Sequence, residues 1–171
     1  MSTIVTVAPL ARPDSRSLSA IAARVLGTEA NGTQTLLRLA LGAIMFPHGA
    51  QHALGWFGGF GFGGTHGWMV KTLGFPAPLA ALAIVTELLA PVALVLGLGG
   101  RVAALGILGL MLGAASTHLS NGFFMNWFGN LPAGGEGFEY HLLVMAISLA
   151  VILRGSGAWS LDRALAGGAR R

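Results

Sequence analysis

The sequence contains no cysteine and few charged residues. Without cysteine, the chain can form no disulfide, thiolate metal site or cysteine-held iron–sulfur cluster, and it can carry out no thiol–disulfide chemistry. Charged residues make up only 9% of the 171 residues, whereas they make up about a quarter of an average soluble protein. Hydrophobic residues account for 54%. This balance predicts an all-α integral membrane protein whose main solvent is lipid.

The basic residues form no patch with interleaved aromatic residues, so we expect no nucleic-acid partner. Four segments are apolar over about the 20 residues that a membrane-spanning helix needs. They cover residues 35–57, 77–98, 102–119 and 138–153. The chain has nine arginines outside the two predicted outer loops. Four precede or open the first segment (Arg12, Arg16, Arg24 and Arg38), Arg101 separates the second segment from the third, and four follow the fourth segment (Arg154, Arg163, Arg170 and Arg171). Because positive residues mark the cytoplasmic side, four spans place both termini in the cytoplasm.

These segments divide the chain into three parts. Residues 1–33 read as a cytoplasmic N-terminal segment without a cleaved signal peptide, residues 34–156 as a four-helix transmembrane bundle, and residues 157–171 as a cytoplasmic tail. Within the first part, "SRSLSAIAARVLG" spaces its apolar residues as a short amphipathic helix on the membrane surface would. A disordered tail is the alternative. In the last part, Ser160 is suited to cap a short helix that contains Asp162.

Polar residues interrupt the first apolar segment in "PHGAQH", residues 47–52. His48 and His52 are four positions apart, so their rings share one helix face, and Gln51 lies beside them. Glu87 lies deep in the second segment, where insertion of an ionised carboxylate costs on the order of 3 kcal/mol. Glu87 should therefore face the interior of the bundle, and we expect His48 to be its partner.

Two prolines lie beside these polar residues. Pro47 and Pro91 have no N–H, so each leaves the carbonyl four residues earlier without its helical donor and kinks the helix. His118 and His141 lie near the outer ends of the third and fourth segments. Because the histidines and Glu87 all lie in the outer half, the pattern predicts a polar pocket between the helices that opens outward.

Three interpretations of this pocket remain open. A histidine and a carboxylate can hydrogen-bond the two oxygens of a quinone head or exchange protons with it. His-x-x-x-His on a helix, with a carboxylate from a neighbouring helix, is also a ligand pattern for a metal or haem, although the metal is not specified. The third interpretation is structural, because histidine and glutamine join helices through hydrogen bonds.

Glycines in the third segment indicate close helix packing. Gly106, Gly109 and Gly113 lie along one stripe, and the spacing from Gly109 to Gly113 lets another helix backbone approach. A transporter or channel is disfavoured, because four spans with polar groups in one half offer no continuous path unless the protein oligomerises.

The order of these motifs resembles one family. "LLRLALGAIMFPHGAQH", then "ELLAPVALVLGLGGRVAALGI", then a histidine-bearing outer loop and finally "GSGAWSLDRAL" are similar to the DoxX family of small bacterial and archaeal membrane proteins. The resemblance implies a four-helix bundle in the cytoplasmic (inner) membrane. It further implies a role as an oxidoreductase subunit, since relatives belong to thiosulfate:quinone oxidoreductases and terminal quinol oxidases.

The residues and the resemblance together predict a small subunit of a quinone-linked redox complex. His48 and Glu87 would be the catalytic residues that accept or supply a proton, and the pocket would be lined by six residues: His48, Gln51, His52, Glu87, His118 and His141. The sequence has no flavin fingerprint, so electrons would come from the cofactor of a redox partner subunit. Membrane lipid is the other expected partner, and a homo-oligomer is allowed. The alternative is a non-catalytic scaffold or assembly factor.

Overall fold

The computed structural model describes residues 23–132 and 134–168. Over these ranges the secondary structure is helical, without a strand. The helices are α2 (Gly32–Leu54), η1 (Trp56–Gly58), α3 (Gly61–Lys71), α4 (Ala77–Leu96), α5 (Gly100–His118), η2 (Leu119–Asn121), α6 (Glu139–Arg154) and α7 (Leu161–Gly168). Residues 23–26 are also helical. Most of the predicted amphipathic helix, however, lies outside the described residues.

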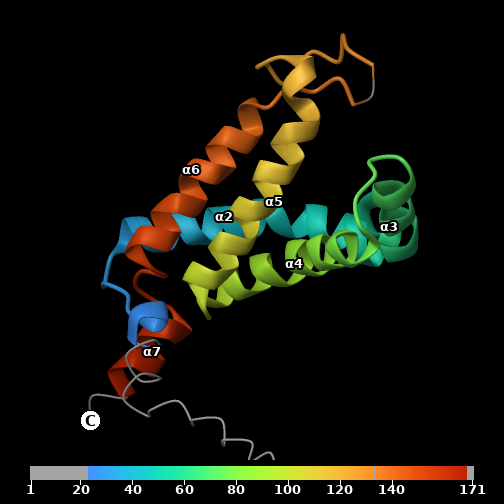
Figure 1. Ribbon diagram of the computed structural model, residues 1–171. Coiled ribbons are helices and arrows are strands. Elements are labelled where there is room, and N and C mark those ends of the chain that lie inside the picture. Colours follow the sequence, from blue (N-terminus) through green and yellow to red (C-terminus); the bar gives the residue numbers. More distant parts are fainter. Residues whose placement is uncertain (1–22, 133, 169–171) are drawn as a thin grey trace, which may run out of the picture.

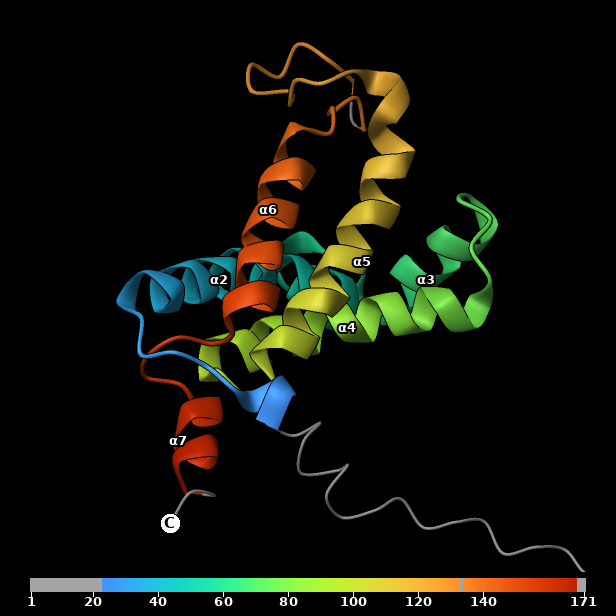
Figure 2. The same cartoon turned by 60° about the vertical axis from the view of Figure 1, so that its left-hand side comes forward.

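The four long helices form two pairs. α2 packs along α4, and α5 packs along α6. Both views show that the α2–α4 pair crosses the α5–α6 pair instead of running beside it (Figures 1 and 2). The core fills the crossing and contains apolar residues from all four helices: Leu41, Met45, Ala90, Leu94, Ala103, Ala104, Ile107, Met111, Val144 and Val151. α3 lies beside the C-terminal end of α2 and the N-terminal end of α4, and α7 lies at the opposite end of the molecule.

Each of the four predicted apolar segments forms a helix with ends close to the expected ones. Within the described part of the chain, however, only Ala77–Leu96 and Gly100–Asn121 are long and apolar enough to cross a membrane by length and composition, with mean hydropathies of 2.4 and 1.7. α2 contains several polar residues, and α6 has only 16 residues. The structure therefore supports a helical protein with two candidate membrane spans. Four spans remain a prediction.

Glycines set the close approach of α2 to α4. A Cβ atom on Gly49 would lie 2.2 Å from the carbonyl oxygen of Glu87, and one on Gly42 would lie 2.9 Å from the carbonyl oxygen of Pro91. Both distances are too short for a real side chain, so only glycine allows this approach. The two contacts also show that α2 and α4 run antiparallel, because the residue number rises along one helix and falls along the other.

A buried polar cluster closes the end of the molecule where α2 begins and α4 ends. The Arg38 guanidinium is buried, and its Nε donates a hydrogen bond to the carbonyl of Ser156 over 2.8 Å. Its Nη1 donates to the carbonyls of Leu94 and Val95, which lie in the last turn of α4. Arg38 therefore ties three separate parts of the chain together.

Asp162 supports the same cluster from α7. It is 1% exposed, and its carboxylate accepts hydrogen bonds from the N–H groups of Gly99 (2.7 Å) and Gly100 (3.0 Å) and from the Ser156 hydroxyl (2.6 Å). A carboxylate at the start of α5 also complements the helix dipole. The prediction that Ser160 caps α7 is confirmed, since its Oγ accepts a hydrogen bond from the N–H of Arg163 over 3.3 Å.

Candidate functional site

The site centres on an ion pair between α2 and α4. His52 Nδ1 lies 2.5 Å from Glu87 Oε2, and the two side chains are 40% and 15% exposed. The expectation that His48 partners Glu87 was wrong. His48 is exposed and faces α6 instead, with its ring centre 6.2 Å from that of Tyr140.

Helix geometry explains this choice of partner. Gly49 lies level with Glu87, because it faces the backbone of that residue. Side chains in a helix lean toward its N-terminus. Because α2 and α4 are antiparallel, the Glu87 side chain leans toward the C-terminal end of α2. His52 lies one turn after Gly49, and its side chain leans toward the N-terminal end of α2, so the two side chains meet. His48 leans in the same direction as His52, but it precedes Gly49, so its side chain leans away from Glu87.

Pro91 adds a further polar group here. The carbonyl of Glu87 lacks its usual helical donor because Pro91 has no N–H. This carbonyl lies against Gly49, where no side chain intervenes. The backbone of α4 is thus exposed to α2 at the residue that carries the carboxylate.

The ion pair lies at the wall of a cavity of about 630 Å³ between α3, α4 and α5. Most of the lining is apolar, and it includes Trp68, Met69, Leu73, Phe75, Leu79, Leu82, Ile84, Leu105, Leu110 and Met111. Among the predicted pocket residues, His52, Glu87 and His118 line this cavity, whereas His48, Gln51 and His141 do not. Their individual roles stay predictions, but the geometry brings half of them together.

Gly109 and Gly113 also line the cavity. A Cβ atom on either would meet nothing within 4 Å, whereas one on Gly106 would lie 2.7 Å from Thr86 Cγ2. The prediction of close packing thus holds within this chain for Gly106 alone among the three. The other two glycines widen the cavity instead of bringing a second helix of the chain closer.

Sequence reasoning missed Thr65, which lines the same cavity from α3. No pattern indicated it, because the "GFGGTHGWMVK" segment is rich in glycine and reads as a loop. α3 is nevertheless helical, packed against α2 and α4. Its helical spacing turns Thr65, Trp68 and Met69 to one face, the face that forms the cavity wall.

His118, His141 and Gln51 make further contacts in the structure. His118 Nδ1 donates a hydrogen bond to the carbonyl of Glu136 over 2.7 Å, and its ring centre lies 5.1 Å from that of His141. His141 is 8% exposed, and its Nδ1 has no hydrogen-bond partner among the described residues. Gln51 Nε2 donates to the carbonyl of Phe57 over 3.3 Å, which supports the turn after α2.

The histidine and glutamate side chains at these positions lie in pairs. In the portion of the chain that is described, no three His, Asp or Glu side chains are grouped so that they could hold a metal ion. His52 and Glu87 form one pair, and His118 and His141 form another.

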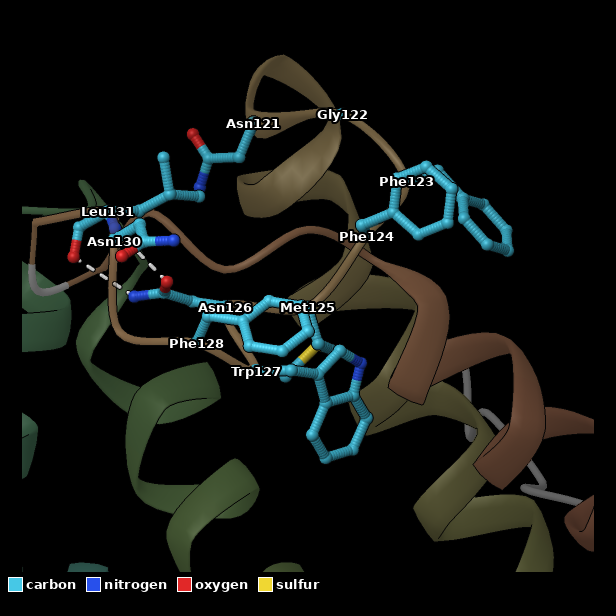
Figure 3. Close-up of a pocket in the computed structure, with 10 residues that line it drawn as sticks. All are labelled: Asn121, Gly122, Phe123, Phe124, Met125, Asn126, Trp127, Phe128, Asn130 and Leu131. Atoms are coloured by element: carbon cyan, nitrogen blue, oxygen red, sulfur yellow. Dashed lines mark hydrogen bonds between the residues drawn. The ribbon is translucent and has the colours of Figure 1, made fainter.

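A second, smaller cavity of about 320 Å³ lies within the loop after α5 (Figure 3). Hydrogen bonds in both directions between Asn126 and Leu131 hold the loop closed. Met125, Trp127 and Phe128 lie together on one side of it. The residues that line this cavity include no titratable side chain, so it offers no group for proton transfer.

The first cavity therefore has the chemistry of a small-molecule site. An imidazole held by a carboxylate can take up or release a proton, and a largely apolar wall suits a ring.

Comparison with known proteins identifies the family. The DoxX family model matches residues 33–127, which is more than half of the chain and includes α2, α3, α4 and α5. His52 and Glu87 lie inside the match, whereas His141 and Asp162 lie beyond it. Neither a curated protein nor a solved structure matched the chain. The resemblance seen in the residue patterns is confirmed, and the chain belongs to the DoxX family.

Proposed function

We propose that this protein is a small subunit of a quinone-linked redox complex and that the cavity between α3, α4 and α5 binds the quinone head. One observation carries the proposal: a carboxylate and an imidazole, Glu87 and His52, meet at 2.5 Å on the wall of a largely apolar cavity of about 630 Å³. Family membership supports the membrane setting.

The donor set fits such a ligand. A quinone, when bound, supplies two-electron chemistry that is coupled to protons. His52 can donate a hydrogen bond to a ring oxygen while Glu87 holds the imidazole in place and stabilises its positive charge. His118 also lines the cavity. The apolar side chains of α4 and α5 exclude water from the ring, which strengthens each of these interactions.

The proton and the electrons follow different routes in this proposal. Oxidation of a quinol releases two protons, and the His52 imidazole and the Glu87 carboxylate can take up one each; reduction of a quinone takes both protons back from the pair. The electrons pass to or from a cofactor on a partner subunit, because the sequence contains neither cysteine ligands nor a flavin fingerprint. His48, the original catalytic candidate, does not line the cavity, so His52 takes that role.

The setting belongs to the same proposal. Four spans in the cytoplasmic membrane, with both termini inside, place the His52–Glu87 pair in the outer half of the bilayer. The cavity then opens toward the outer side, away from the buried cluster of Arg38 and Asp162.

A non-catalytic scaffold is the second candidate function. It is favoured by the fact that the His52–Glu87 bond joins two helices, as buried polar groups in membranes commonly do. Under this alternative the pair stabilises α2 on α4 and binds no ligand.

Purification from the native membrane in a mild detergent separates the two candidates. The bands are identified by mass spectrometry, and lipid-soluble cofactors are extracted from the wild type, His52→Asn and the control His48→Asn. We expect quinone and a stoichiometric redox partner with the wild type and with His48→Asn, and loss of quinone with His52→Asn. A lone protein without quinone, whose stability falls with His52→Asn, would support the scaffold.

A further inference from the structure

Thr65 holds a buried hydroxyl that nothing in the described structure satisfies. The residue is 3% exposed, and its Oγ1 has no hydrogen-bond partner. A threonine in a helix commonly bonds the carbonyl of the preceding turn, but Thr65 does not. A buried hydroxyl without a partner destabilises a fold, and it therefore requires a reason.

The position of Thr65 supplies the reason. Other buried atoms without a partner in the described chain are Gln34 Nε2, Arg101 Nε, His141 Nδ1 and Ser148 Oγ, and none of their residues lines either cavity. Thr65 lines the cavity that holds His52 and Glu87. Its neighbours on the same face of α3, Trp68 and Met69, are apolar. Among these α3 residues of the lining, Thr65 is the one with a polar side chain.

We propose that Thr65 is a specificity-determining residue that binds the second oxygen of the ring, while His52 and Glu87 bind the first. This inference rests on the proposed function and adds the group that distinguishes a ring with two oxygens from a ring with one. A hydroxyl both donates and accepts. Thr65 thus donates to a carbonyl oxygen of the oxidised ring and accepts from a hydroxyl of the reduced ring, so both redox forms bind.

Two substitutions isolate the hydroxyl. Thr65→Val keeps the shape and removes the hydrogen bond, whereas Thr65→Ser keeps the hydroxyl. The full chain is placed in lipid nanodiscs, and calorimetry measures the Kd of decyl-benzoquinone and of a decyl-phenol that has only one ring oxygen. We expect Thr65→Val to raise the Kd of the quinone about five- to tenfold. The Kd of the phenol should change by less than about twofold, and Thr65→Ser should bind both as the wild type does.

Thermal unfolding without ligand adds an independent readout. Because Thr65→Val removes an unsatisfied buried hydroxyl, the variant should unfold at the same temperature as the wild type or at a higher one. A lower unfolding temperature would show that the hydroxyl is structural and would overturn the inference. An unchanged quinone Kd in Thr65→Val would overturn it as well, with the proposed function intact. A wild type that binds no quinone would overturn both.

Discussion

The carboxylate of Asp162 accepts a hydrogen bond from the backbone N–H of Gly100 over 3.0 Å, across 62 positions of sequence. The same carboxylate accepts from Gly99 and from the Ser156 hydroxyl. It satisfies N–H groups at the start of α5 that have no partner within the helix. Asp162 thereby fixes the segment after α6 to the turn between α4 and α5.

Replacement of Asp162 should therefore destabilise the whole fold. Asp162→Ala leaves two backbone N–H groups and a hydroxyl unpaired in a buried site, and we expect the free energy of unfolding to fall by about 3–5 kcal/mol. Glu29→Ala is a matched control that removes the same charge, because Glu29 is 73% exposed and its ion pair with Arg154 spans 3.8 Å. That change should cost less than about 1 kcal/mol. Equal losses in denaturant unfolding would contradict the role assigned to Asp162.

Gly49 and Gly109 should respond to alanine in opposite directions. Gly49→Ala places a Cβ atom 2.2 Å from the carbonyl oxygen of Glu87, so α2 and α4 must separate, and we expect a loss of about 1–3 kcal/mol. Gly109→Ala meets nothing within 4 Å and gains helix propensity, so we expect a gain of up to about 1 kcal/mol. Thermal unfolding in detergent measures both. A destabilised Gly109→Ala whose oligomer dissociates would show that a second chain packs on Gly109.

The choice of His52 over His48 can be measured as a coupling energy. In a double-mutant cycle with Glu87→Ala, we expect His52→Ala to show a coupling of about 0.5–3 kcal/mol in unfolding free energy, because the two groups are in contact. The parallel cycle with His48→Ala should be additive within about 0.5 kcal/mol. Coupling to His48 and not to His52 would restore the original expectation and refute the pairing described here.

Single cysteines can decide how many helices cross the membrane, because the chain has none of its own. Suitable exposed positions are Phe60, Leu98, Phe128 and Leu161. With four spans, an impermeant thiol reagent applied outside should label Phe60→Cys and Phe128→Cys but neither Leu98→Cys nor Leu161→Cys. If only α4 and α5 cross, Leu161→Cys is labelled together with Phe128→Cys.

The long helices were largely predictable from the sequence, whereas α3 was not. The apolar segment expected at 77–98 is the helix Ala77–Leu96, because a long apolar run ended by glycine is a strong local signal. α3 contains four glycines, Gly61, Gly63, Gly64 and Gly67, and has no such signal. Its helix is supported by contacts with α2 and α4, which the local sequence does not contain.

The candidate site was likewise predictable only in part. Glu87, His52 and His118 were recognisable because polar residues in an apolar segment need a reason to be there. Thr65 was not, since a threonine in a glycine-rich segment is unremarkable until its hydroxyl is found buried and unpaired.

The sequence by itself determined the solvent, the helical class, the family and the residue types available for chemistry, because composition and periodicity are local properties. Only the tertiary structure decided which of these residues lie in contact. The pairing of His52 with Glu87 depends on the axial position of α2 relative to the antiparallel α4. Gly49 sets this position, because it allows contact with the α4 backbone. The cavity depends on the packing of α3 against α2 and α4, and no run of residues along the chain encodes that packing.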